Sequence, residues 1–530
     1  MTADNNSKSE SIFSSCFGSS EVPITNLGPF VGSIDQGTSS TRFIVFDKVG
    51  NPVASSQSEF PQYYPQAGWA EHNIEEIFEY TMKCIEDVVV YMKKHGMDPA
   101  GIKSVGITNQ RETTCVWDRD TGKPLHKALV WLDTRTKDLV KELTDKTPSK
   151  DAKHFAKKCG LPLSTYFSAV KLKWLLENVK EVKEANDKGT LMFGTIDTWM
   201  LYKLTGAIAG GVHVTDVTNA SRTMLMDLKT LAWDDEICDF FGIKKACLPL
   251  IKSSSEVYGK ICQGSLKDVP IAGILGDQQA ALVGQLCLKK GQLKNTYGTG
   301  CFMLANTGEE PVISTHGLLT TVGYQLGPKA PCMYALEGSI AIAGASVKWL
   351  RDNMGIIKSA KEVGDLAAKV ENTGGVYFVP AFSGLFAPHW VDSARGTIVG
   401  MTQYTTKEHL CRATLEAVSY QTKDIIDSME KDSGIPINLL RVDGGMANSD
   451  QLMEIQANIS GIDLDRPSML ETTALGAALV AGLAVGVWTN LDEFKSEATM
   501  KRFNPSSTAE QRQEMHAGWK KALEKAFDWA

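Results

Sequence analysis

One pattern occurs twice in this sequence and constrains the fold more than any other feature: an apolar strand, a short turn of glycine and hydroxyl residues, and a second strand. The first copy spans residues 32–47 and begins GSIDQGTSSTR. The second spans residues 293–306 and reads LKNTYGTGCFMLAN. A chain of 530 residues is too long for one hydrophobic core. The weak internal repeat therefore predicts two related α/β domains, with a boundary near Gln285.

Local patterns around the first copy predict its neighbouring elements. Apolar runs at residues 29–35, 42–47 and 52–60 are joined by short links, which predicts an antiparallel meander of three strands. Helical spacing of apolar residues begins at Ile74, and Asn73 stands where an N-cap is expected.

The overall charge argues against a nucleic-acid partner. The formal net charge is -7, the isoelectric point is about 5.8, and no basic block stands out. The 11 cysteines are dispersed and none forms a CxxC pair. This distribution predicts buried, reduced thiols in a cytoplasmic protein.

Two further segments, residues 1–28 and residues 472–491, have an unusual composition. Residues 1–28 are rich in Ser and Asn, which predicts a disordered tail without a targeting signal. Residues 472–491 carry no charge, so their length alone permits a membrane span. Many alanines and glycines make this segment only weakly hydrophobic, so we expect a close-packed buried helix and no membrane span.

Four glycine-containing turns each follow an apolar strand: DQGTSSTR, GDQQ, YGTG and VDGG. Each could be a plain turn, and in GDQQ Asp277 could simply cap a helix. Taken together, they predict a small-molecule cleft between two domains. The motifs of P-loop enzymes, dinucleotide-binding dehydrogenases, protein kinases, α/β-hydrolases and zincins do not occur.

At this point a family resemblance becomes apparent. The stretches that carry it are DQGTSSTR, GITNQRETT, YFSAVKLKWLL, GDQQAALVGQ, NTYGTGCF, FSGLFAPHWVDSARGTIVGMT, RVDGGMANS and TALGAALVAGLAVG. In this order they resemble the glycerol kinases, members of the FGGY carbohydrate kinase family. The resemblance covers the chain from residue 29 to residue 519.

This resemblance implies an α/β fold of two actin-like (ribonuclease H-like) domains flanking an ATP-binding cleft. The N-terminal domain, residues 29–284, would hold glycerol and phosphate, and the C-terminal domain, residues 285–530, the nucleotide. The implied activity is ATP-dependent phosphorylation of glycerol to sn-glycerol 3-phosphate. A homo-oligomer, dimer or tetramer, is also expected.

The same resemblance explains why a carboxylate stands at the start of a phosphate-binding turn. Asp35 would serve the ATP-bound Mg²⁺ through water, since Mg²⁺ tends to keep its waters. The hydroxyl residues Thr38, Ser39 and Ser40 would contact phosphate oxygens, and Arg42 would add positive charge. Asp277 would be both a second metal ligand and the general base.

The residues that the resemblance assigns to glycerol divide into polar and aromatic ones. The polar residues are Arg111, Glu112, Tyr166, Asp277 and Gln278. Trp131 and Phe302 would pack against the carbon edge of glycerol. Without the resemblance, Arg111 and Glu112 would be interpreted as a surface ion pair, and Trp131 as a core residue.

On the nucleotide side, the matching positions are Thr299, Gly344, Lys348, Gly445 and Ser449. Lys348 and Ser449 stand where many bacterial members have Gln and Asn, so the individual adenosine contacts are the weakest part of the assignment. The stretch CQGSLKDVP, residues 262–270, also departs from many bacterial members, whose Gly-Gly-Thr-Arg loop binds the inhibitor fructose 1,6-bisphosphate. We expect this chain to be insensitive to that compound.

Two rival functions stay open at this stage. One is another FGGY kinase that acts on a different sugar or polyol. The other is an ATPase of the actin or Hsp70 kind, which would act on protein partners and would not need the set formed by Arg111, Glu112 and Tyr166.

Overall fold

The computed structural model describes residues 28–494 and 499–530, so the predicted tail lies outside the described residues except for Gly28. The described residues form two compact units. The first contains the described parts of Met1–Gly284, Thr321–Cys332 and Glu471–Glu497. The second contains those of Gln285–Thr320, Met333–Leu470 and Ala498–Ala530. Each unit has a hydrophobic core of its own.

The sheet of the first unit has the order β13-β14-β5-β1-β2-β3. Its strands are β1 (Phe30–Gln36), β2 (Ser40–Phe46), β3 (Pro52–Glu59), β5 (Ile102–Asn109), β13 (Ser255–Lys260) and β14 (Pro270–Gly276). β2 pairs antiparallel with β1 and β3, which confirms the predicted meander. β5 lies parallel to β1 and to β14, and β13 closes this edge as an antiparallel strand.

The strands of the second unit repeat this arrangement. Those of its main sheet are β15 (Leu293–Tyr297), β16 (Cys301–Gly308), β18 (Cys332–Ile340), β21 (Leu439–Asp443), β22 (Asp463–Pro467) and β23 (Met500–Phe503), and β19 (Tyr377–Val379) and β20 (Thr397–Val399) form a separate antiparallel pair. Their order is β18-β16-β15-β21-β22-β23. The pairs β18/β16, β16/β15 and β22/β23 are antiparallel, and β15/β21 and β21/β22 are parallel. This is the order of strand directions found in the first unit, which confirms the prediction of two related α/β folds.

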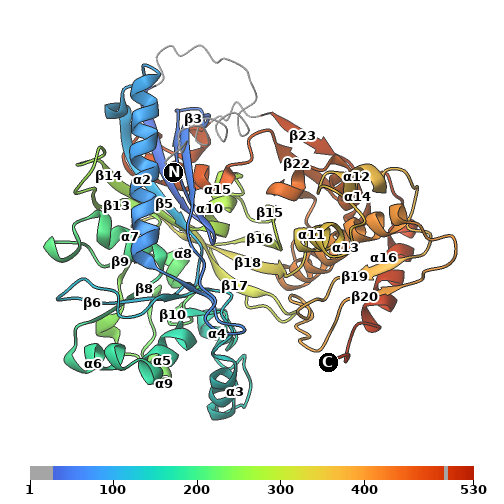
Figure 1. Cartoon of the computed structure of the whole chain (residues 1–530), viewed down its shortest axis with the longest axis horizontal. Coiled ribbons are helices and arrows are strands. Elements are labelled where there is room, and N and C mark those ends of the chain that lie inside the picture. Colours follow the sequence, from blue (N-terminus) through green and yellow to red (C-terminus); the bar gives the residue numbers. More distant parts are fainter. Residues whose placement is uncertain (1–27, 495–498) are drawn as a thin grey trace, which may run out of the picture. The chain divides into compact units, whose positions relative to one another are not determined.

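Helices cover both faces of the first sheet. Alternate residues of a strand point to opposite faces. Val105 and Ile107 of β5 belong to the core that contains Ile77 of helix α2 (Ile74–Lys94). A Cβ on the intervening Gly106 would meet the carbonyl oxygen of Ala477. That residue belongs to helix α15 (Thr472–Ala484). Figure 1 shows α2 in blue and α15 in red beside the strands.

The other helices of the first unit include α3 (Lys137–Lys146), α4 (Ala156–Cys159), α5 (Ser168–Asn178), α6 (Lys180–Lys188), α7 (Ile196–Leu204), α8 (Val217–Ala220), α9 (Asp235–Phe241) and α10 (Asp277–Gly284). As predicted, the Asn73 side chain caps α2 by accepting a hydrogen bond from the amide of Glu75.

The charge-free segment after Glu471 is a buried helix, as predicted. α15 lies against α10, and a Cβ on Gly476 would come within 1.9 Å of the Ala280 carbonyl oxygen. Alanine and glycine allow this close approach of two backbones. Within the described ranges, no helix combines the length and apolarity that crossing a membrane requires.

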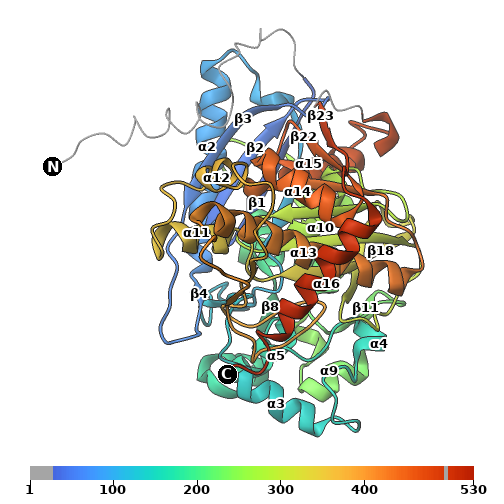
Figure 2. The ribbon, with the colours of Figure 1, turned by 90° about the vertical axis from the view of Figure 1, so that its right-hand side faces the viewer.

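In the second unit, helices α13 (Lys407–Ser433), α14 (Asp450–Ser460) and α16 (Ala509–Glu524) lie close together (Figure 2). Asp424 of α13 accepts hydrogen bonds from His516 and Trp519 of α16. Burial alone would raise the Asp424 pKa, but these bonds and one from His389 lower it to about 2. Shorter helices α11 (Gly344–Asp352) and α12 (Glu362–Ala367) complete the unit.

Candidate functional site

The turn between β1 and β2 is held from two sides. Its own closing bond runs from the Gly37 amide to the Ser40 carbonyl, 3.0 Å apart. Gln110 Nε2 donates to the Gly37 carbonyl at 3.0 Å. Trp131 Nε1 donates to Thr38 Oγ1, also at 3.0 Å. The structure therefore brings Trp131 next to the hydroxyl residues predicted to hold phosphate.

Arg42 lies between two carboxylates. Its Nη2 is 2.5 Å from Oδ2 of the buried Asp35, and its Nη1 is 2.6 Å from Oε2 of Glu471. The sequence had assigned Arg42 to phosphate and had not assigned Glu471 at all. With two acidic partners, this guanidinium compensates the charge of the buried Asp35.

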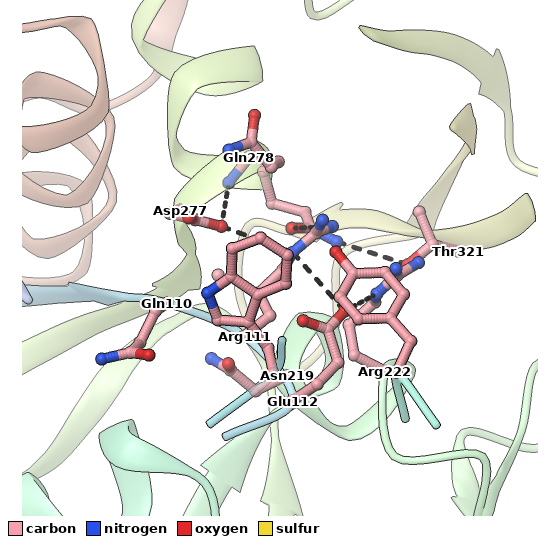
Figure 3. Close-up of polar contacts among 12 residues, drawn as sticks. Gln110, Arg111, Glu112, Asn219, Arg222, Asp277, Gln278 and Thr321 are labelled. Carbon is pink, nitrogen blue, oxygen red and sulfur yellow. Dashed lines mark hydrogen bonds and ion pairs between the residues drawn. The ribbon is translucent and has the colours of Figure 1, made fainter. Parts of the chain in front are cut away.

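A second group of charges forms where β5 and β14 end. Arg111 Nε lies 3.3 Å from Asp277 Oδ1 and 3.8 Å from Glu112 Oε1. The side chains of Arg111 and Glu112 are each only 2% exposed, whereas that of Asp277 is 31% exposed. The interpretation of Arg111 and Glu112 as a surface ion pair is therefore wrong. Figure 3 shows the three side chains converging.

Glu112 adopts an unusual backbone conformation. Its φ is 60°, a left-handed value that non-glycine residues adopt seldom and often at functional sites. Its carbonyl accepts a hydrogen bond from Ser168 Oγ at 3.0 Å, and Oε1 lies 2.6 Å from Nε of the fully buried Arg222. These contacts fix both the backbone and the carboxylate of Glu112.

An aromatic pair lies beside these charges. The rings of Trp131 and Tyr166 meet edge to face, with centroids 5.6 Å apart. Behind Tyr166, the Nζ of Lys171 donates to the carbonyls of Thr165 and Tyr166, at 2.8 and 2.5 Å. Complete burial lowers the Lys171 pKa to about 7. Trp131, one of the two residues predicted for the aromatic wall, thus lies next to Tyr166, one of the predicted polar residues.

Helix α10 begins at Asp277, so GDQQ is a helix start, with Asp277 as the first residue of the helix itself. The carboxylate accepts a hydrogen bond from the Gln278 amide at 2.8 Å. The next residue, Gln279, accepts from Arg111 Nη1 at 3.3 Å and donates to the carbonyl of Val322 at 3.1 Å. A helix start does not by itself account for the 3.3 Å contact of Asp277 with Arg111.

In the second unit, the Gly-Thr-Gly turn contacts the start of α11. The amides of Ala343 and Ala345 donate to the Thr299 carbonyl, at 2.9 and 3.1 Å. A Cβ on Gly344 would come within 2.6 Å of the Gly298 carbonyl oxygen. Glycine at position 344 thus allows the turn and the start of the helix to come close together. Thr299 itself is exposed in this turn.

The remaining predicted positions of this unit differ in their surroundings. Gly445 is exposed, and a Cβ there would meet no atom within 4 Å. Lys348 is exposed on α11. Ser449 caps α14 by accepting from the Leu452 amide, so its hydroxyl already has a structural role. Phe302 is half-buried on β16.

Three residues of this group were not predicted. Arg222 and Glu471 are long-range partners of Glu112 and Arg42, whereas Lys171 binds carbonyls only five and six positions earlier in the chain. Lys171 could have been suspected, because a charged residue in an otherwise apolar helical stretch must find buried acceptors. Arg222 and Glu471 carry no local signal, since each partner is remote in sequence.

Comparisons with known proteins agree on one family. Residues 30–284 match the N-terminal domain, and residues 293–485 the C-terminal domain, of the FGGY family of carbohydrate kinases. A glycerol kinase of Arabidopsis thaliana is 55% identical over 515 residues, covering 94% of this chain and 98% of the relative. One from Brucella anthropi is also 55% identical, with 94% and 99% covered.

Solved structures show the same relationship. The crystal structure of Plasmodium falciparum glycerol kinase with ADP matches with a TM-score of 0.87 at 40% identity, covering 94% of this chain and 98% of that one. A gluconate kinase from Lactobacillus acidophilus matches with a TM-score of 0.80 at 23% identity, over 94% and 96% of the two chains. The second match shows the fold alone.

Proposed function

The chain belongs to the FGGY family of carbohydrate kinases, and we propose that it transfers the γ-phosphoryl group of ATP to glycerol, forming sn-glycerol 3-phosphate and ADP. Full-length relatives named glycerol kinase support this proposal. The observation that carries it is the group of opposite charges formed by Asp277, Arg111 and Glu112, together with the aromatic pair of Trp131 and Tyr166. A small triol needs closely spaced donors and acceptors next to a wall for its carbon edge.

Each of the grouped residues has a proposed role toward glycerol. Arg111 donates to glycerol oxygens, and the Glu112 carboxylate accepts from a hydroxyl, while Gln278 and Tyr166 complete the polar contacts. Trp131 packs against the carbon edge, and Phe302 of the second unit is proposed to do the same. Burial of Arg111 and Glu112 makes their hydrogen bonds discriminating, because a missing partner would leave a buried charge unpaired.

Asp277 is the proposed general base. The reacting hydroxyl oxygen forms a bond to the γ-phosphorus, the bond to the β-γ bridging oxygen breaks, and the hydroxyl proton passes to the Asp277 carboxylate. The partial exposure of this carboxylate leaves it accessible to a substrate. Arg111 holds it in place through the 3.3 Å contact. Such a base mainly orients the nucleophile, since the proton leaves late in phosphoryl transfer.

We propose that phosphate is held by Thr38, Ser39 and Ser40 on the first unit, with Arg42 adding positive charge, and by Thr299 on the second unit. Gly344, Lys348, Gly445 and Ser449 are the proposed nucleoside side. Mg²⁺ would neutralise phosphate charge, with Asp35 and Asp277 as carboxylate ligands. Among the described residues no cluster of three or more metal-binding side chains occurs. Two carboxylates fit Mg²⁺, which retains water and phosphate ligands.

We further propose a cytoplasmic location and a homo-oligomeric assembly. The ten described cysteines are all free, which supports a reducing, cytoplasmic environment. A homo-oligomer, dimer or tetramer, is proposed from the resemblance alone.

A substrate screen tests the proposed function. ADP release would be followed by a coupled assay with glycerol, dihydroxyacetone, erythritol, xylulose and ribulose. We expect glycerol to give the highest kcat/KM. A higher value for a pentulose or tetritol would make the chain another FGGY kinase, and ATP turnover independent of every polyol would favour an ATPase of the actin type.

The variant Asp277→Asn tests the proposed general base. It keeps the oxygen that contacts Arg111 and removes the basic carboxylate. We expect kcat with glycerol to fall by about a hundredfold or more, the effect of losing a general base, with glycerol binding retained. A kcat within a few-fold of wild type would remove Asp277 from this role.

A further inference from the structure

We propose that Arg222 is a positioning residue of the glycerol site: its buried side chain keeps Glu112 and Tyr166 in place. This inference rests on the proposed function. Arg222 follows the short helix α8 and belongs to none of the motifs that carry the family resemblance. Its side chain is completely buried, so its charge has a structural or positioning purpose and is not displayed to solvent.

The ion-pair distances assign each of two carboxylates, Glu112 and Asp277, mainly to a different arginine. Glu112 Oε1 is 2.6 Å from Arg222 Nε but 3.8 Å from Arg111 Nε. Arg111 Nε is nearer to Asp277 Oδ1, at 3.3 Å. Arg222 is therefore the main counter-charge of Glu112, which leaves Arg111 able to pair with the proposed base. Figure 3 shows Glu112 and Arg222 pointing toward one another.

Arg222 also contacts the aromatic side of the site. Its guanidinium carbon lies 5.8 Å from the centre of the Tyr166 ring and 5.4 Å from that of Phe167. Distances below about 6 Å allow a cation–π attraction. One buried side chain thus contacts two of the residues proposed to bind glycerol, one through charge and one through its ring.

The backbone that carries Arg222 is tied to both substrate loops. Asn219 exchanges side-chain hydrogen bonds with Asn109, at the end of the strand that leads to Arg111. Thr218 Oγ1 accepts from the amide of Gly276, immediately before Asp277. These bonds fix the backbone from which the Arg222 side chain extends, so the fold determines the distance between Arg222 and Glu112.

Removing Arg222 should therefore damage glycerol binding selectively. Glu112 would lose its nearer arginine and keep the more distant Arg111, which would be drawn away from Asp277. Solvent hardly reaches the Glu112 side chain, which is 2% exposed, so the carboxylate would lose its nearest counter-charge in a buried environment. The contacts described above for Arg222 run to Glu112, Tyr166 and Phe167, all on the proposed glycerol side.

The test compares Arg222→Met and Arg222→Lys with wild type in steady-state kinetics. For Arg222→Met we expect the KM for glycerol to rise about tenfold or more, the usual effect of losing a charged hydrogen bond, with the KM for ATP changed less than about twofold. Arg222→Lys should recover part of the glycerol affinity, since an ammonium can pair with Glu112 but lacks the guanidinium fork. An unchanged glycerol KM in Arg222→Met would overturn the inference.

A matched control and a rescue variant guard against misfolding. Arg412→Met removes a partly buried arginine whose Nε lies 2.9 Å from Glu416 Oε1 in the second unit, and should leave the glycerol KM unchanged. If Arg222→Met does not fold, the double variant Arg222→Met/Glu112→Gln removes both charges. The inference then predicts that it folds and has the glycerol KM of Glu112→Gln alone. A double variant that is additively worse would show that Arg222 acts independently of Glu112.

Thermal shifts separate this inference from the proposed function. Wild type should be stabilised by glycerol, and Arg222→Met should show a smaller shift at the same glycerol concentration while keeping the shift caused by ADP with Mg²⁺. If wild type shows neither a glycerol shift nor glycerol turnover, the proposed function fails. If wild type responds to glycerol and Arg222→Met responds equally, only the positioning role fails.

Discussion

At the scale of single residues, the candidate site consists of buried charges whose partners are fixed. Lys171 is the clearest case outside the proposed chemistry. Burial lowers its pKa from the ordinary value of 10.5 to about 7, although Glu112 and Asp133 act in the opposite direction. A neutral amine still has two N–H groups, which suffice for the carbonyls of Thr165 and Tyr166. The lysine can thus hold the backbone of Tyr166 without a charge.

This lowered pKa predicts a pH dependence of stability. Between pH 7 and 10.5 the unfolded chain binds the Lys171 proton and the folded chain does not. The lysine's contribution to the free energy of unfolding should therefore increase as pH rises through this window. In urea unfolding between pH 7 and 9.5, wild type should gain stability relative to Lys171→Met as the pH increases. Parallel pH profiles of the two proteins would contradict the lowered pKa.

Whether the role of a residue could be predicted depends on how far apart in the sequence that residue and its partners lie. Asp35 and Asp277 stand at strand ends beside glycine-containing turns, so local sequence already marks them. Arg222 pairs with Glu112 across 110 positions of the chain, and no local pattern records such a pairing. Burial of Arg111 could not be predicted for the same reason, because it depends on Gln279 and Asp277.

At the scale of elements, hydrophobic alternation and turn residues were sufficient to predict the meander and helix α2. The place of α15 could not be predicted, since its partners β5, β14 and α10 all lie far earlier in the sequence. Local sequence showed only that the helix must be buried. The structure adds which surfaces meet: Gly476 faces Ala280, and Gly284 faces Thr472.

This close packing gives a prediction for α15. In Gly476→Ala the new methyl group would meet the Ala280 carbonyl oxygen, a backbone atom that cannot move alone. We expect a loss of about 1–3 kcal/mol in the free energy of unfolding, the usual cost of overpacking. Because α10 begins with Asp277, the displaced helix should also lower kcat for glycerol. Unchanged stability and kcat in chemical denaturation and kinetics would show that the two helices adapt freely.

The segment of residues 262–270 gives a second prediction at this scale. Glu86 of α2 accepts hydrogen bonds from the amide and hydroxyl of Ser265, so a carboxylate already occupies donors that an anion would need. Asp268 adds a second negative charge in a left-handed conformation, with φ 69°. Both charges disfavour a sugar bisphosphate.

We therefore expect no inhibition by fructose 1,6-bisphosphate up to millimolar concentrations, at sub-saturating and at saturating glycerol. Lys267 is the one residue of this stretch that could still attract a phosphate group as a point charge. A dose-dependent loss of kcat that disappears in Lys267→Ala would show that the segment retains an anion site.

At the scale of the whole molecule, the same order of strand directions occurs in two units, each around its own core. The repeated hairpin made this partly predictable. The sequence could not indicate that Thr321–Cys332 and the segment after Glu471 return to the first unit, since neither carries a boundary signal. That return places α15 and Glu471 with the residues proposed to bind glycerol and phosphate.

Separate cores predict that the two units unfold in separable steps. In calorimetry, the measured enthalpy should exceed the van't Hoff enthalpy of a single transition. Gly476→Ala should lower the midpoint of the first unit, and Leu440→Ala, which empties a buried position on β21, that of the second. Most proposed glycerol residues belong to the first unit, so glycerol should raise mainly the transition that Gly476→Ala lowers. A single transition with equal enthalpies, shifted alike by both variants, would mean that the units fold as one.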